Sequence, residues 1–149
     1  MKDISKKLAS LLKEGNCTPL ISKIAKKLKE PSTTIHYNIK KMEKEGSISS
    51  YKAVFDYKKI DEGFCCFVLV NLSPDEYMNP EKVAGELARH NEVESVDICT
   101  GDWEVVLKVR TKDQDEYYNF VKRVLSKKGI EKTKTLTSMK QIKTEFVIV

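Results

Sequence analysis

The chain has 149 residues, of which 40% are hydrophobic and 33% are charged, and its formal net charge is +5. This composition is typical of a globular protein, and no run of about 18 apolar residues predicts a transmembrane helix. The N-terminus lacks the apolar core of a secretory signal, so the cytoplasm is the expected location. Four cysteines occur without a C-x-x-C pair, which favours reduced packing residues over a disulfide or a metal cluster.

The positive charge is concentrated in the first third of the chain. Residues 1–46 contain 11 lysines and 5 acidic residues, a net charge of +6, whereas residues 47–149 carry −1. A basic segment beside a nearly neutral remainder is expected of a domain that binds a polyanion, although lysine-rich helix faces are also often only solvated.

Residues 1–46 predict three short helices that close on one small core. The first helix has an apolar face and ends at Gly15-Asn16. Thr18 is the expected N-cap of the second helix, with Pro19 at its first position, and Pro31 ends that helix. The apolar positions recur at helical spacing: Ile4, Leu8, Leu11 and Leu12 in the first helix, then Leu20, Ile24, Ala25 and Leu28 in the second.

The third predicted helix is apolar on one side and polar on the other. Ser32 is its expected cap, and Ile35, Ile39 and Met42 form the inner face. The outer face carries hydroxyl, aromatic and amino groups, which suit base edges and phosphates in a DNA major groove. The expected DNA-contacting residues are Ser32, Thr33, Thr34, His36, Tyr37, Lys40, Lys41 and Lys44. A helix-turn-helix is therefore favoured over a bundle whose lysines are only solvated.

Residues 47–62 are expected to link two domains. The composition of residues 47–55 is strand-like and predicts a wing beside the DNA backbone, where Ser49, Ser50 and Lys52 would touch phosphates. The polar stretch that follows ends at Gly63 and predicts a hinge, with the domain boundary near residue 60.

Residues 63–149 predict the order strand, helix, strand, strand, helix, strand. The elements expected before the final strand or pair of strands are a strand at 64–72, a helix from Pro80 capped by Asn79, strands at 92–99 and 103–110, and a helix from Asp113. Asp113 and Glu116 have the spacing of a capping box. This order is the split βαβ, ferredoxin-like arrangement, so the predicted fold class is α+β with an N-terminal winged helix-turn-helix.

The strand at residues 64–72 is apolar on both faces, although helices in this arrangement cover only one face of the sheet. An uncovered apolar sheet face is unfavourable in water by about 25 cal/mol per Å². The same face of a second copy is the simplest cover, so the sequence predicts a homodimer.

No catalytic constellation, phosphate-binding loop or metal-spaced cluster occurs in the sequence, so no catalytic residue, metal or cofactor is expected. The turn Thr100-Gly101-Asp102 offers a carboxylate and a flexible backbone to a ligand, and Thr133, Thr135 and Thr137 alternate along the last strand. A plain β-turn and a threonine-rich edge strand explain the same residues, so the residues alone leave both readings open.

Both halves of the chain resemble the Lrp/AsnC family of feast/famine transcription regulators. The resemblance rests on IAKKLKEPSTTIHYNIKKMEKEGSISSYKAVFDYKKI, on SVDICTGDWEVVLKVR and on FVKRVLSKKGIEKTKT. It implies dimers and often octamers, with double-stranded DNA and the transcription machinery as partners. It also implies an amino-acid effector bound near Thr100, Gly101, Asp102, Thr133 and Thr135. The family's recognition helix usually carries arginines, but this one carries only lysines, so guanine reading is expected to be weaker.

The sequence therefore predicts a non-enzymatic, sequence-specific transcription regulator. The expected domains are a helix-turn-helix at 1–46, a linker strand and hinge at 47–62, and a ferredoxin-like dimerisation and amino-acid-sensing domain at 63–149. An effector-independent, chromatin-like architectural protein is the alternative. A remote one is an enzyme like the tetrapyrrole decarboxylases that resemble this family, but two histidines and three arginines are few groups to surround a macrocycle.

Overall fold

The structure is a computed structural model that describes residues 3–148. The chain divides into two compact units, Met1–Val54 and Phe55–Val149, which are described one at a time. Within the described residues, no helix is long and apolar enough to cross a membrane. The same residues contain no group of three or more His, Cys, Asp or Glu side chains that could hold a metal ion.

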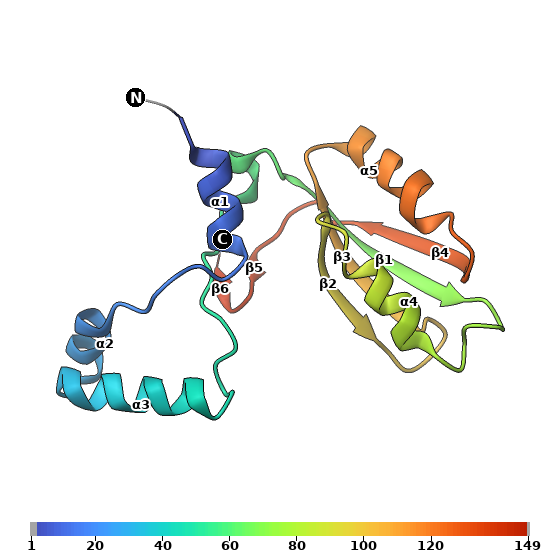
Figure 1. Cartoon of the computed structure of the whole chain (residues 1–149). Coiled ribbons are helices and arrows are strands. Elements are labelled where there is room, and N and C mark those ends of the chain that lie inside the picture. The colour runs from blue at the N-terminus through green and yellow to red at the C-terminus, as the bar shows by residue number, and fades with distance from the viewer. Residues whose placement is uncertain (1–2, 149) are drawn as a thin grey trace. The chain divides into compact units, whose positions relative to one another are not determined.

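The first unit contains the three predicted helices, α1 (Ser5–Lys13), α2 (Ile21–Leu28) and α3 (Ser32–Lys44). Helix α2 packs against α3, whereas Figure 1 shows α1 apart from that pair. Each helix buries a single residue: Ala9, Ala25 and Ile35. The prediction that three apolar faces close on one core was therefore wrong for the single chain. The apolar side chains of α1 stay about half exposed: Ile4 at 53%, Leu8 at 48% and Leu11 at 51%.

Two helix starts differ from the prediction. Helix α2 begins at Ile21 rather than at Pro19, because residues 18–20 run on in a non-helical conformation. Helix α3 has Pro31 at the N-cap and Ser32 inside its first turn, and no side chain caps it. The fixed φ of proline, here −59°, suits a residue that enters a helix, so Pro31 supplies the start that we expected from Ser32.

The predicted wing strand is absent from residues 47–55, which the structure describes in full. Tyr51 makes only an isolated parallel bridge to Asn16, and the Ala53 N–H donates to the Leu12 carbonyl at 3.0 Å. Strand-like composition was insufficient here because a strand needs a neighbouring strand edge, and this segment makes only the one bridge to Asn16.

The second unit has the predicted element order. It contains β1 (Phe64–Leu72), α4 (Pro80–Leu87), β2 (Val93–Ile98), β3 (Val105–Thr111), α5 (Gln114–Phe120) with the π-helical turn η2 (Val121–Leu125), and β4 (Ile130–Thr137). The sheet order is β2-β3-β1-β4 and every neighbouring pair is antiparallel. A short helix, η1 (Tyr57–Ile60), precedes the sheet, and a hairpin of β5 (Lys143–Thr144) and β6 (Val147–Ile148) follows it.

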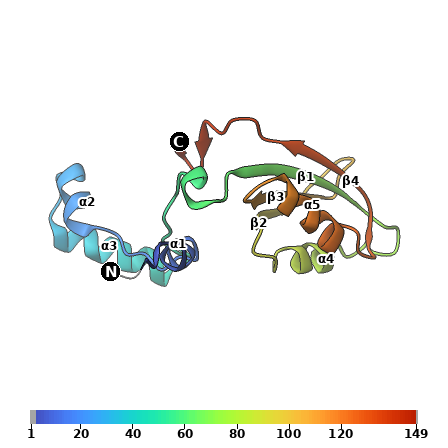
Figure 2. The ribbon, with the colours of Figure 1, turned by 90° about the horizontal axis from the view of Figure 1, so that it is seen from above.

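Helices α4 and α5 cover the same face of the sheet, as Figure 2 shows. Beneath them, alternate residues of the two central strands are almost fully buried, because the side chains of a strand alternate between the two faces. The core residues of β1 and β3 are Cys66, Val68, Val70, Leu72, Val105, Leu107 and Val109, and Phe120 of α5 fills the space above them.

The other face of the sheet carries no helix. Phe67 and Leu136 are cross-strand neighbours on this face and are 39% and 46% exposed. Leu69 and Val106 form a second, half-buried pair beside them. The structure thus confirms that β1 is apolar on both faces, although Cys65 on the open face is itself buried.

Candidate nucleic-acid interface and effector site

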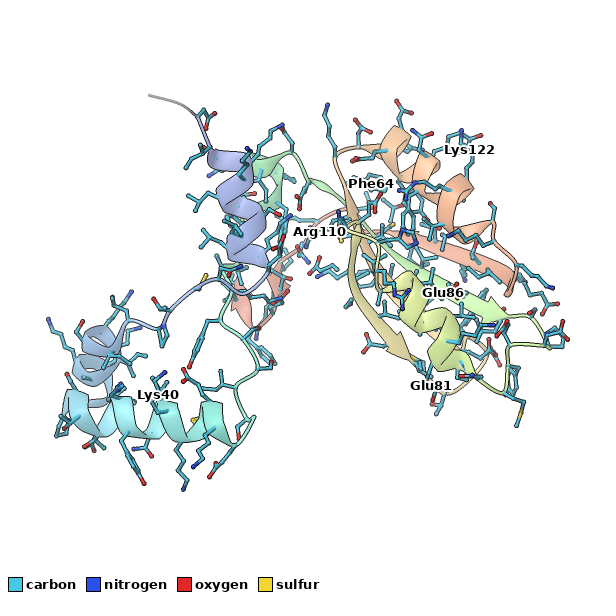
Figure 3. All side chains as sticks on the ribbon, viewed as in Figure 1. Lys40, Phe64, Glu81, Glu86, Arg110 and Lys122 are labelled. Carbon is cyan, nitrogen blue, oxygen red and sulfur yellow. The ribbon has the colours of Figure 1, made fainter. Side chains whose placement is uncertain are left out.

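The predicted DNA-contacting residues all lie on α3 and all are exposed. Ile35 is the only buried residue of this helix, whereas Tyr37 is 70% exposed. The structure therefore brings the predicted hydroxyl, aromatic and amino groups onto one accessible helix, with Lys40 marked in Figure 3. A helix of 13 residues with its polar groups exposed can enter a DNA major groove.

Acidic neighbours that the sequence analysis overlooked engage two of the lysines on this helix. The Lys40 amino group lies 2.7 Å from a Glu43 carboxylate oxygen, and Lys41 lies 3.8 Å from Glu45. The hydrogen bond to Glu43 raises the pKa of Lys40 and lowers that of the Glu43 carboxyl. By contrast, Lys44 makes no ion pair within residues 3–148, which leaves its charge available to a phosphate.

Glu43 also joins α3 to the segment that follows it. The Tyr51 hydroxyl donates a hydrogen bond to the other Glu43 oxygen at 3.1 Å. Desolvation, and then this bond, raise the pKa of Tyr51. The spacing of Lys40 and Glu43 is that of helical neighbours and could have been noticed in the sequence, but the contact from Tyr51 depends on how residues 47–54 fold back.

The predicted effector turn lies between β2 and β3, and Thr100, Gly101 and Asp102 are all exposed. Gly101 has a φ of +106°, a conformation that L side chains rarely adopt. The Asp102 carboxylate accepts no hydrogen bond from any described residue. The turn therefore presents a free carboxylate and an accessible backbone to solvent.

The side chains of Asn71 and Glu104, which the sequence analysis did not single out, hold this turn against the end of β1. The Asn71 side-chain amide donates to the Asp102 carbonyl oxygen, and the Leu72 N–H donates to the Glu104 carboxylate at 2.9 Å. The bond from Leu72 lowers the pKa of the Glu104 carboxyl. Asn71 and Glu104 are polar residues beside apolar strand residues, and this was the sequence feature that could have identified them.

The predicted threonines of β4 lie on the helix-covered face of the sheet. Thr133 pairs with Val70 and Thr135 with Val68. Thr133 lies at the same end of the sheet as the turn, because Val70 also pairs with Val105 at the start of β3. Thr135 lies further along, where its hydroxyl is 2.5 Å from that of Tyr117 on α5. The structure thus brings Thr133 toward the turn and engages Thr135 with a helix.

Comparisons with known proteins identify the family of the chain. The family model of the Lrp/AsnC ligand binding domain matches residues 65–148. An HTH-type transcriptional regulator of Pyrococcus furiosus is 36% identical over 132 residues, which cover 88% of each chain.

Solved structures match nearly the whole chain as well. The crystal structure of an AsnC family transcriptional regulator from Agrobacterium tumefaciens has a TM-score of 0.75 at 26% identity, covering 97% of this chain and 94% of that one. A transcriptional regulator from Neisseria meningitidis, solved in complex with L-methionine, shares the fold with a TM-score of 0.74 at 21% identity and the same coverage.

The mixed α/β fold and these matches define a transcriptional regulator of the helix-turn-helix type. More narrowly, the chain belongs to the Lrp/AsnC family.

Proposed function

We propose that the protein regulates transcription by binding specific DNA sequences through α3, the second helix of a helix-turn-helix. The observation that carries this proposal is the exposure of every predicted contact residue on a helix that buries only Ile35. In this role Thr33, Tyr37, Lys40 and Lys44 face the groove, while Ser32, Thr34, His36 and Lys41 contact bases or phosphates on either side.

Competition binding on genomic fragments tests this proposal. Fragments from the protein's own regulatory regions should compete at least about tenfold better than random DNA of equal length. Equal affinity for every fragment, with only a salt dependence, would overturn sequence specificity and favour the architectural alternative.

A charge-removal pair of variants tests the placement of the binding face. Lys44→Ala should weaken binding and reduce the slope of log affinity against log salt by about one phosphate contact. Lys122→Ala, on η2 of the second unit, should leave both quantities unchanged. Equal effects of the two substitutions would argue against α3 as the interface.

We further propose that two copies associate through the open face of the ferredoxin-like second unit. This face exposes Phe67 and Leu136 as neighbours, and burying them would remove apolar surface from water. Such a dimer presents two copies of α3 to two half-sites, with spacing set by the DNA helical turn.

The effector site that we propose consists of Thr100, Gly101 and Asp102 together with Thr133 and Thr135. Its support is the free Asp102 carboxylate, the positive φ of Gly101 and the L-methionine bound by the regulator from Neisseria meningitidis. The carboxylate would hold the amino group of a free amino acid. Isothermal titration calorimetry with each of the twenty amino acids tests this role, and Asp102→Asn should weaken the strongest binder at least about tenfold. An unchanged affinity would remove Asp102 from the site.

A further inference from the structure

A polar pocket of about 460 Å³ lies at the end of the second unit's sheet that is remote from the Thr100–Asp102 turn. Its walls come from the loop between α4 and β2, from the end of β3, from α5 and η2, and from the residues that lead into β1. None of the lining residues has an aliphatic side chain. A pocket of this composition suits a ligand that is polar throughout.

All three arginines of the chain line this one pocket: Arg89, Arg110 and Arg123. They come from the turn after α4, from β3 and from η2, and are more than ten residues apart in the sequence, so only the fold brings them together. The pocket also holds His90, one of the chain's two histidines. Arginine is the side chain best suited to bind a carboxylate, because its planar fork donates two parallel hydrogen bonds.

The three arginines differ in how many partners their guanidinium groups already have. Arg110 is buried, its Nε donates to Glu94, and its Nη2 donates to the Gln141 side chain at 2.7 Å. Arg123 is paired with Glu92 but remains half exposed. The exposed guanidinium of Arg89 has no hydrogen-bond or ion-pair partner within residues 3–148. A ligand carboxylate would therefore meet Arg89 first, with Arg123 beside it.

Carboxylates line the same pocket, and they would repel a ligand that carries only negative charge. Glu62, Glu92 and Glu116 contribute negative charge to its walls. Glu116 is held in place because one of its oxygens accepts a hydrogen bond from the Lys112 N–H at 2.6 Å. Cationic and anionic groups in one polar pocket complement a ligand that carries both charges.

We infer that this pocket binds a free amino acid with a polar or charged side chain, at a site separate from the Thr100–Asp102 turn. Arg89 and Arg123 bind the carboxylate, and Glu116 binds the ammonium group. The absence of aliphatic lining excludes amino acids such as leucine and methionine as preferred ligands.

The pocket adjoins the segment through which the chain enters the sheet of the second unit. Glu62 lies between η1 and β1, in the segment through which the chain enters the sheet. The Arg110 guanidinium stacks 3.6 Å above the ring of Tyr57, the first residue of η1. Figure 3 shows Arg110 and Phe64 at this end of the sheet. A ligand in the pocket therefore lies beside η1 and the residues that lead into β1.

The test is calorimetric titration of the full chain with L-glutamine, L-glutamate, L-arginine, L-leucine, L-methionine and inorganic phosphate. Asp102→Asn is used as the background, so that binding at the turn does not interfere. We expect a polar amino acid to bind, and Arg89→Gln to weaken that binding at least about tenfold. Lys122→Gln is the control, because it also removes one positive charge, at a residue next to Arg123 that does not line the pocket. It should leave the affinity within about twofold.

Each contrary outcome overturns the inference. Binding of phosphate alone would make the pocket an anion site, and preference for leucine or methionine would contradict its polar specificity. Equal loss in Arg89→Gln and Lys122→Gln would place the ligand elsewhere, as would the absence of any binding. The proposed regulatory role of this ligand rests on the proposed DNA binding, but the titration contains no DNA. A failure of DNA recognition and a failure of this pocket are therefore distinguishable.

Discussion

Glu43 sits on the proposed DNA-reading helix and opposes the charge that DNA binding needs. It holds Lys40 at 2.7 Å, so a phosphate that binds Lys40 must displace a carboxylate and then tolerate its negative charge nearby. We predict that Glu43→Gln raises affinity for DNA severalfold and steepens the salt dependence, because one more lysine then neutralises phosphate. Fluorescence anisotropy over a series of salt concentrations measures both quantities.

Glu86→Gln is the control for this change, since it removes one negative charge from α4 in the second unit, as marked in Figure 3. It should leave the salt slope unaltered. Weaker DNA binding by Glu43→Gln would show instead that the bridge from Lys40 and Tyr51 to Glu43 is needed to hold α3 in its binding form.

Tyr117 makes the stability of the second unit sensitive to alkali. Burial raises the pKa of its hydroxyl from 10.0 to about 12. In this range the unfolded chain loses the proton first, so the free energy of unfolding falls as the pH rises from about 10 toward 12. Tyr117→Phe should show a smaller loss of stability between pH 9 and 11 than the wild type, measured by denaturant unfolding at each pH.

Tyr118→Phe provides the matched comparison, because Tyr118 is the next residue of α5 and is 60% exposed. Its pH profile should follow that of the wild type. A profile for Tyr117→Phe that overlies the other two would mean that this buried hydroxyl does not set the alkaline limit.

At the scale of elements, helix starts were predictable where one local interaction decides them. Asp113 caps α5 by accepting a hydrogen bond from the Glu116 N–H at 2.9 Å, as the capping-box spacing predicts. The predicted caps at Thr18 and Ser32 failed, because backbone geometry around Leu20 and Pro31 sets those boundaries instead. Hydroxyl residues before an apolar run are compatible with several registers. At α5 the Asp113 side chain caps the helix, and the Glu116 carboxylate accepts from the Lys112 N–H, so two hydrogen bonds fix one register.

Asp113→Ala should therefore destabilise the second unit by about 1 kcal/mol, which is the usual cost of losing an N-cap side chain. Asp115→Ala removes a similar carboxylate from the first turn of the same helix, without an N-cap hydrogen bond to lose. Urea unfolding of the two variants separates the cap from the charge. Equal destabilisation would assign the effect to the helix dipole.

At the scale of the whole molecule, the order of elements followed from local periodicity, but the assembled sites did not. A continuous apolar run identified β1, alternation identified β3, and helical spacing identified α4 and α5. The convergence of Arg89, Arg110 and Arg123 depends on a sheet order in which distant segments end together. Likewise, the strand expected at residues 47–55 failed because its partner edge is a property of the folded unit.

The open sheet face provides the last prediction, because its apolar pair has no cover in the single chain. Phe67 is 39% exposed beside Leu136 at 46%, and a second copy would bury both. Phe67→Lys should weaken the dimer at least about tenfold, since it removes a buried ring and places an ammonium group in the interface. Sedimentation velocity over a range of protein concentrations would then show monomer where the wild type is dimeric. Met78→Lys, at an 88% exposed loop position, should leave the dimer intact. A wild-type chain that stays monomeric at micromolar concentration would refute association through this face. Two copies of α3 would then not be held together to read paired half-sites.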